Sequence, residues 1–159
     1  MSNLKIIQLL PELNIGGVER GTKDFSKVLI DQGHKSIVIS NGGIFEKDII
    51  NDGGKHIKLP IHKKNLSSLF LSKQLKLIFE DEMPDIVHVR SRMPAWINFL
   101  AFKKMPIKPI LVSTFHGLYS TPIYSKVMAK VDHTIAISNT VKNYIIDTYK
   151  VSESMITTI

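Results

Sequence analysis

Three short stretches carry residues that could bind an anion or assist group transfer. Gly16 and Gly17 follow an apolar run and begin a helical pattern, while Arg90, Arg92 and His116 follow two later apolar runs. Glycines at a helix start let backbone N–H groups approach a phosphate closely. Arginine binds phosphate or carboxylate oxygens through two parallel hydrogen bonds, and histidine can bind a hydroxyl or stabilise charge. The residues predict an anion site; the alternatives are a simple tight turn, surface ion pairs and a structural histidine.

The two arginines lie two residues apart on a segment expected to be extended. Alternate side chains of an extended segment point the same way, so Arg90 and Arg92 are expected to face one ligand. They are two of only three arginines in the chain, and lysine supplies the rest of the positive charge. This selective placement indicates recognition of phosphate or carboxylate.

The glycine turn does not fit a dinucleotide-binding fingerprint. Val18 stands where the second glycine of G-x-G-x-x-G belongs, and the next apolar run ends in Ser40 and Asn41 rather than in a carboxylate. A Walker lysine motif is absent, no pair of histidines has metal-ligand spacing, and the chain has no cysteine. We therefore expect no nicotinamide cofactor and no metal.

Apolar runs alternate with helical patterns along the whole chain. The runs predict strands at residues 4–10, 35–40, 56–61, 85–90, 109–115, 132–138 and 155–159. Helices are predicted at residues 17–34, 44–52, 65–82, 94–104, 122–131 and 139–150. This alternation predicts an α/β fold, a doubly wound and mostly parallel sheet of about seven strands in one domain over residues 1–159. Ligands bind such sheets at the carboxyl ends of the strands, where the residues named above lie.

Positive charge is concentrated in one segment. The formal net charge is +7, and residues 53–131 hold thirteen Lys or Arg against four acids. Such a block indicates an anionic partner, namely nucleic acid, a membrane surface or a phosphorylated substrate, unless it is only a solvated lysine face. Nucleic acid is disfavoured because the nearby aromatic residues Phe70, Phe79, Trp96 and Phe99 have helical core spacing rather than that of a stacking platform.

Four lysines, Lys63, Lys64, Lys73 and Lys76, lie on or beside a predicted amphipathic helix. Residues 53–79 contain no acid, so these lysines could face an anionic membrane, or simply water. The first apolar run is too short for a signal peptide, and no apolar stretch approaches the roughly 20 residues that span a bilayer. We expect a cytoplasmic protein, either free or peripheral on the inner face of the cytoplasmic membrane.

Four motifs in this order resemble the amino-terminal half of family four glycosyltransferases: IIQLLPELNIGGVER, DIVHVRSRMPAW, STFHG and AISNTV. These are retaining enzymes of the GT-B fold, in which two Rossmann-like domains face each other across a cleft. The resemblance covers the whole chain. The RSR-x-PAW form resembles bacterial members that build cell-envelope polysaccharide or lipopolysaccharide.

The resemblance implies a role for each candidate residue. Gly16 and Gly17 would admit the donor diphosphate, and His116 would reach the transferred sugar as the catalytic residue. Arg90 and Arg92 would bind an anionic part of acceptor or donor. The chain would be the acceptor-binding domain of a transferase that moves sugar from a nucleotide sugar to a cell-envelope glycan or glycolipid. The nucleotide-sugar domain of the family is not found in this sequence, so the chain alone is expected to be inactive.

Two other functions fit part of the pattern. The basic segment would also suit a non-catalytic module that binds phosphate or nucleic acid. A nucleotide-sugar epimerase has the same two-domain GT-B architecture, although its carboxylate pattern is not visible here. In the transferase and the epimerase the nucleotide sugar is a substrate, and neither prediction uses a separate cofactor.

Overall fold

All seven expected strands form, and they pair in one fully parallel sheet. The computed structural model describes residues 3–63 and 70–159. The strands are β1 Lys5–Leu9, β2 Lys35–Ser40, β3 Lys55–Lys58, β4 Ile86–Val89, β5 Ile110–Phe115, β6 His133–Ala136 and β7 Ile156–Thr158. Their order across the sheet is β3-β2-β1-β4-β5-β6-β7, which confirms the predicted doubly wound α/β fold.

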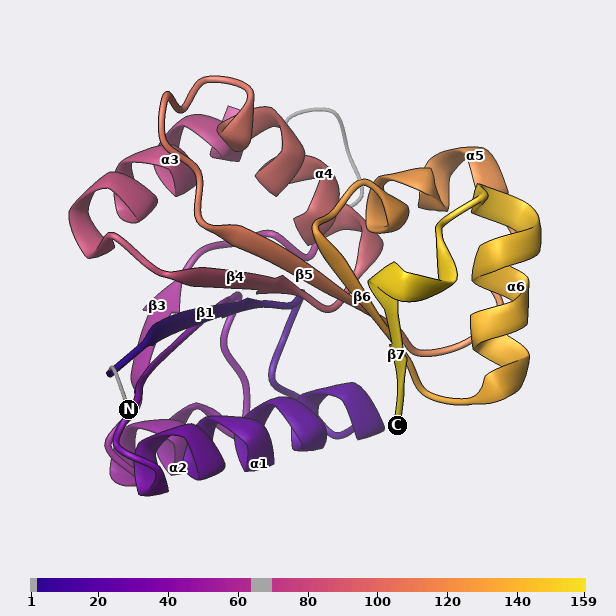
Figure 1. The fold of residues 1–159 in the computed structure, drawn as a ribbon. Coiled ribbons are helices and arrows are strands. Elements are labelled where there is room, and N and C mark those ends of the chain that lie inside the picture. Colours follow the sequence, from indigo (N-terminus) through magenta and orange to yellow (C-terminus); the bar gives the residue numbers. More distant parts are fainter. Residues whose placement is uncertain (1–2, 64–69) are drawn as a thin grey trace.

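Helices cover both faces of the sheet. They are α1 Gly17–Asp31, α2 Glu46–Asn51, α3 Leu71–Glu82, α4 Arg92–Phe102, α5 Pro122–Ser125 and α6 Asn139–Tyr149. Figure 1 shows α1 and α2 beneath the sheet, with α3 and α4 above it. The single helix expected at 122–131 is instead the short α5 followed by a 3₁₀ turn, Lys126–Ala129. No helix in the described part of the chain is both long and apolar enough to cross a membrane.

Both faces of the sheet are buried because both are covered; the face toward α3 and α4 is largely apolar, whereas the face toward α1 carries buried Gln8, Ser36 and His88. Ile7, Ile39 and Val87 in the central strands are at most 3% exposed. On one side α3 and α4 pack together through Phe79 and Phe102, whose rings meet edge to face with centroids 5.7 Å apart. Burial on both faces explains why the strands appear as mostly apolar runs.

The strand order reverses between β1 and β4, and this reversal defines the candidate site. β1 pairs with β2 on one side and with β4 on the other, so the chain winds first one way and then the opposite way. The loops that leave the carboxyl ends of β1 and β4 therefore separate here. A crevice at such a switch point is the usual ligand site of an open α/β sheet.

The loops after β1 and β2 are joined by backbone hydrogen bonds. The Leu13 N–H donates to the Gly42 carbonyl at 2.9 Å, and the Phe45 N–H donates to the Leu13 carbonyl at 3.1 Å. Gly43 has a φ of +150°, and a side chain there would overlap the Leu13 backbone. Below these loops lies a buried cluster of Leu10, Leu13, Val38 and Ile49. The segment that leads into the glycine turn is thereby fixed to β2.

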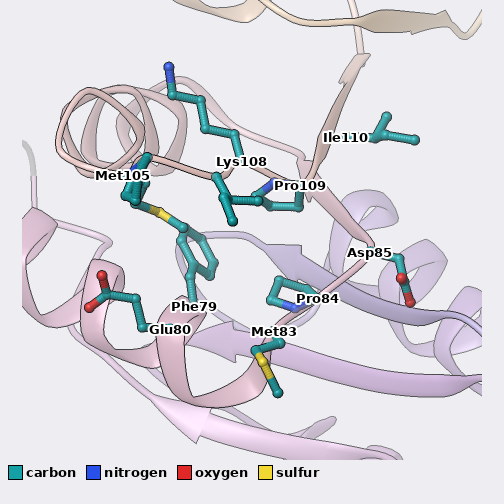
Figure 2. Close-up of a pocket in the computed structure, with 11 residues that line it drawn as sticks. Phe79, Glu80, Met83, Pro84, Asp85, Met105, Lys108, Pro109 and Ile110 are labelled. Atoms are coloured by element: carbon teal, nitrogen blue, oxygen red, sulfur yellow. The ribbon is translucent and has the colours of Figure 1, made fainter.

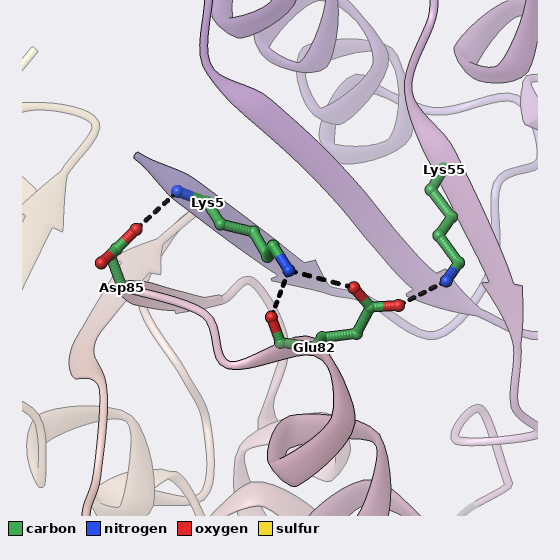
Figure 3. Close-up of polar contacts among 4 residues, drawn as sticks. All are labelled: Lys5, Lys55, Glu82 and Asp85. Carbon is green, nitrogen blue, oxygen red and sulfur yellow. Dashed lines mark hydrogen bonds and ion pairs between the residues drawn. The ribbon is translucent and has the colours of Figure 1, made fainter. Parts of the chain in front are cut away.

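At the opposite edge of the sheet, Glu82 binds two lysines (Figure 3). The Lys5 ammonium lies 3.4 Å from one Glu82 carboxylate oxygen, and Lys55 donates to the other. The Lys5 backbone N–H donates to Asp85 Oδ2 at 2.7 Å. These contacts join the end of α3 to β1 and β3. The Glu82 side chain is only 12% exposed, so water is partly excluded from them.

We expect Glu82→Gln to destabilise the domain by about 1–2 kcal/mol at pH 7, the usual worth of a hydrogen bond to a charged group. The hydrogen bond from Lys55, together with its charge and that of Lys5, holds the pKa of Glu82 below its ordinary value. This stabilisation is present above the unfolded pKa near 4.5 and is lost as the pH falls through the lower folded pKa. Urea unfolding at pH 7 and pH 3 measures the change.

The matched control is Glu80→Gln, which removes an exposed pair with Lys76 on the same helix. That pair should contribute at most about 0.5 kcal/mol. Equal destabilisation by the two substitutions, or a Glu82 effect that does not shrink as the pH is lowered, would contradict the assignment.

Candidate functional site

The glycine turn lies at the carboxyl edge of the sheet and starts α1. Gly16 is extended and precedes the helix, and its carbonyl accepts the Arg20 N–H at 3.0 Å. A side chain at Gly17 would meet no other atom within 4 Å, so this part of the turn is open. At Gly16 an added Cβ would instead overlap the Glu19 carboxylate. One carboxylate of the chain itself therefore lies beside the turn where an anion is expected to bind.

Arg90, directly after β4, is a half-buried cation held behind this turn. Its Nη1 donates to Gln8 Oε1 at 2.8 Å, and Gln8, fully buried in β1, donates through Nε2 to the Thr22 carbonyl at 3.1 Å. The guanidinium lies close to α1, because a Cβ at Gly21 would be 3.4 Å from Nη2, which is van der Waals contact. Burial lowers the pKa of Arg90 to about 10, while the nearby Glu19 acts in the opposite direction. Arg90 therefore stays charged at neutral pH.

Arg92 does not point with Arg90, so the expectation of a shared direction was wrong. Its guanidinium lies over the rings of Tyr119 and Tyr124, at 5.0 and 5.3 Å from their centroids, and its Nη1 lies 3.4 Å from Ser125 Oγ. The reason is that Arg92 is the first residue of α4. The alternation of an extended segment ends before it.

His116 follows β5 and is partly buried, with its Nε2 atom enclosed but without a hydrogen-bond partner. Burial, and then the charge of Arg90, lower the pKa of His116 to about 4. His88, within β4, donates to or accepts from Thr114 Oγ1 at 2.7 Å, as expected of a core histidine. Its pKa is lowered to about 3 by burial and then by the charges of Arg90 and His116. Both imidazoles are neutral at pH 7.

The site thus combines a fixed cation, a neutral imidazole and an open helix start. Several side-chain polar atoms in the described part of the chain are buried without a hydrogen-bond partner, and two of them, Arg90 Nε and His116 Nε2, belong to the candidate residues. Buried polar atoms are normally paired, because an unpaired one costs about 1–3 kcal/mol. A ligand that supplied partners to both would gain this energy. The arrangement suits an anion whose charge grows during a reaction, such as a departing phosphate.

The two depressed histidine pKa values predict a domain that loses stability in acid. An unfolded histidine has a pKa near 6.5, so between about pH 6.5 and 4 the unfolded chain binds protons that folded His88 and His116 do not. The free energy of unfolding should therefore fall as the pH is lowered through this window, and the contribution of these two histidines levels off below about pH 3. Urea titrations at each pH measure the slope, and His88→Gln should flatten it. An unchanged slope in that variant would contradict the assignment.

The apolar pocket in Figure 2 is not part of this site. Its volume is about 530 Å³, and it is lined by the loops before β4 and β5, including Met83, Pro84, Met105 and Ile107. These loops lie at the amino ends of the strands, the edge opposite the glycine turn. None of the sequence-predicted ligand-binding residues lines it.

Three of the four lysines expected at a membrane lie in the described part of the chain. Lys63 and Lys73 are exposed, and Lys64 lies outside the described residues. Lys76 pairs with Glu80 at 2.7 Å. Of the four, two described lysines therefore remain exposed without an ion pair to a described carboxylate.

Sequence reasoning missed Gln8 and Glu19, which contact or neighbour the predicted residues. Gln8 did carry a signal, since it is a polar residue inside the apolar run of β1 and its neighbours Ile7 and Leu9 are buried. Glu19 carried none, because an acid in the first turn of a helix is ordinary. Tyr119 lies in a loop, and no feature of the sequence indicates its contact with Arg92.

Comparison with known proteins identifies the family to which this chain belongs. Residues 15–159 match the model of Glycosyltransferase Family 4. The chain belongs to glycosyltransferase family 4. This domain also superposes over its whole length on a glycosyltransferase from Rickettsia africae, with a TM-score of 0.83 and 36% identity, and covers 43% of that chain.

Two further proteins are less similar in sequence to this family-four domain. One subunit of the human phosphatidylinositol N-acetylglucosaminyltransferase is 29% identical over 140 residues, which are 84% of this chain and 28% of the human protein. Anabaena HepE, solved with UDP and glucose, shares the fold at 18% identity and a TM-score of 0.71, over 99% of this chain and 44% of its own. The family-four domain thus spans less than half of each of these proteins.

Proposed function

We propose that this domain binds the acceptor in a retaining glycosyltransferase that moves a sugar from a nucleotide-sugar donor to a cell-envelope glycan or glycolipid. The observation that carries the proposal is the pair of buried, unpartnered atoms Arg90 Nε and His116 Nε2, at the edge where the glycine turn is open. Family membership favours sugar transfer, and the fold of HepE with UDP and glucose supports a nucleotide-sugar donor. The donor is a substrate, and the proposal uses no metal.

Each residue has a defined part in this proposal. The open backbone at Gly17, next to Gly16, admits the donor diphosphate, and Arg90 supplies a positive charge behind the turn. His116, neutral at pH 7, hydrogen bonds to the transferred sugar. Arg92 is oriented by two tyrosine rings and faces the acceptor side. Its remaining N–H groups donate hydrogen bonds to the acceptor. Glu19 must leave the turn, or pair with Arg20 or Arg90, when a phosphate arrives.

The test is transfer by the intact enzyme that contains this domain. Nucleotide sugars are supplied with a glycolipid acceptor, and release of the nucleoside diphosphate is followed together with the anomeric configuration of the product by NMR. Transfer with retained configuration supports the proposal, whereas inverted configuration refutes the retaining part. Epimerised nucleotide sugar without transfer would favour the epimerase. That alternative has the support of fold alone, from a Rickettsia bellii epimerase at 14% identity and a TM-score of 0.70.

The nucleic-acid alternative has less support. Phe79 is 1% exposed and packs on Phe102, while Trp96 and Phe99 are half-buried against each other and the core. These three rings are therefore not free to stack on bases, whereas Phe70 is 82% exposed, so the expectation of a core position was wrong for that residue. DNA binding with an affinity that falls steeply as the salt concentration rises would nevertheless support the nucleic-acid alternative.

We further propose that the enzyme binds anionic membrane surfaces peripherally through Lys63, Lys64, Lys73 and Lys76. Each lysine near such a surface contributes about 1 kcal/mol. Replacing all four by Gln should abolish most co-sedimentation with anionic vesicles at low salt, while Lys76, already paired with Glu80, should contribute least. Equal binding to neutral vesicles would contradict the proposal.

A further inference from the structure

Three polar residues lie in line near the carboxyl ends of β2 and β3: Ser40, His56 and Glu46. The Ser40 hydroxyl oxygen lies 2.9 Å from His56 Nε2, and His56 Nδ1 lies 3.4 Å from Glu46 Oε1. Ser40 ends β2, His56 lies in β3 and Glu46 begins α2. Three elements of the fold are therefore joined through polar side chains that are not part of the candidate donor site.

The order serine, histidine, carboxylate is that of a nucleophilic triad, but this serine cannot act as a nucleophile. In a hydrolase the serine oxygen attacks the substrate and must therefore reach it. Ser40 is 0% exposed, and its hydroxyl oxygen already accepts the Gly42 N–H at 3.0 Å. The His56 side chain is 2% exposed. The three residues therefore act within the protein and not on a substrate.

The Glu46 carboxylate determines the direction of the hydrogen bonds. A proton on His56 Nδ1 can face Glu46 Oε1, whereas an unprotonated Nδ1 would bring two lone pairs together. Nε2 is then the acceptor, so Ser40 donates its O–H to His56 and accepts the Gly42 N–H. Burial lowers the pKa of His56 against the opposing charge of Glu46, and the charge of Lys58 lowers it further. The imidazole is therefore neutral at pH 7 and keeps its acceptor atom.

This chain of hydrogen bonds continues to the glycine turn. Gly42, whose N–H is bound by Ser40, accepts the Leu13 N–H through its carbonyl at 2.9 Å. Gly42 has a φ of +91°, a conformation that favours glycine, so its peptide groups are held in an unusual orientation. Leu13 is 0% exposed and lies just before Gly16 and Gly17. A displacement of Gly42 would therefore move the segment that carries the turn.

We propose that Ser40 and His56 are positioning residues for the glycine turn and thereby for the donor diphosphate. They touch no substrate atom and act through Gly42 and Leu13 on the backbone that binds it. Groups that bind a ligand must be held to within about 0.5 Å, so fixing this loop in advance strengthens donor binding. The inference rests on the proposed transferase function and adds the residues that fix its donor site.

The kinetic test uses the intact enzyme and the nucleotide sugar that supports transfer. Ser40→Ala should raise KM for this donor about tenfold and change kcat by less than about twofold, because a displaced turn weakens binding of ground state and transition state alike. A purely structural loss would instead reduce the folded fraction and lower kcat at unchanged KM. An unchanged donor KM in Ser40→Ala would overturn the proposal.

Matched variants separate positioning from stability. Ser36 is a second buried serine of β2, 3% exposed and hydrogen bonded to Ser26 Oγ at 2.8 Å, so Ser36→Ala removes a comparable contact. It should leave the donor KM within about twofold of the wild type. His56→Leu should act like Ser40→Ala, whereas the amide of His56→Gln can accept the Ser40 O–H and should restore most of the affinity. Equal donor KM values within either pair of variants would contradict the assignment.

Hydrogen–deuterium exchange of the intact enzyme gives a readout that needs no turnover. Ser40→Ala should speed exchange about tenfold in residues 41–46 and also in residues 11–17, whereas Ser36→Ala should speed neither. Faster exchange confined to residues 41–46 would refute the coupling to the turn. Coupled exchange in an enzyme that transfers no sugar would refute the proposed transferase and leave the positioning role standing. Sugar transfer without coupled exchange would sink this inference alone.

Discussion

Replacing His116 by Ala in the intact enzyme should lower kcat by roughly a hundredfold. The expected loss is that of one hydrogen bond to a group that develops charge, on the order of 3 kcal/mol. His116 Nε2 is enclosed and has no partner within the described chain, so the substitution would remove the proposed ligand contact and breaks no internal hydrogen bond at this atom. Steady-state transfer assays with saturating acceptor measure the change.

The fold should survive this substitution, which thermal unfolding of the variant checks. His116→Gln should restore part of the rate, because a neutral amide can still donate one hydrogen bond. If His116→Ala unfolds the domain while the remaining folded enzyme stays fully active, the residue is structural.

The pH dependence of transfer tests the protonation state of His116. With a pKa of about 4, the imidazole is neutral throughout the range from pH 5.5 to 8. This residue should therefore add no inflection to the rate profile in that range. An inflection near pH 6.5 that disappears in the Ala variant would contradict a neutral His116.

Arg90→Met should reduce kcat/KM by about thirtyfold, which corresponds to roughly 2 kcal/mol for a lost contact to a charged group. The same variant should raise the pKa of His116, because the charge of Arg90 is the second cause of its depression. Burial, the larger cause, remains, so the pKa should stay below the ordinary 6.5. A ¹H–¹⁵N titration of the imidazole follows this directly.

Arg92→Met is the matched control for the imidazole titration alone, since Arg92 contacts Tyr119 and Tyr124 and does not influence the pKa of His116. Gln8→Leu should act in the same direction as Arg90→Met but more weakly, because it removes only the group that positions the guanidinium. If Arg90→Met leaves both the rate and the His116 pKa unchanged, Arg90 is a structural cation.

The sequence by itself determined the order of strands and helices and the edge at which the ligand residues gather. Hydrophobic periodicity is a property of neighbouring residues, so β1 to β7 could be predicted without knowing their partners. The carboxyl ends of parallel strands share one edge, and this alone placed Gly16, Arg90 and His116 together. The family motifs added which chemistry to expect there.

Only the tertiary structure decided where the side chains at that edge point and what they contact. Arg90 is held by Gln8, 82 residues away, and Arg92 turns to Tyr119 because a helix begins where an extended segment was expected. The loops after β1 and β2 are likewise joined by backbone hydrogen bonds of Leu13 with Gly42 and Phe45. Such contacts join segments far apart in the chain, and their energies depend on burial and distance, which no local pattern of residue types encodes.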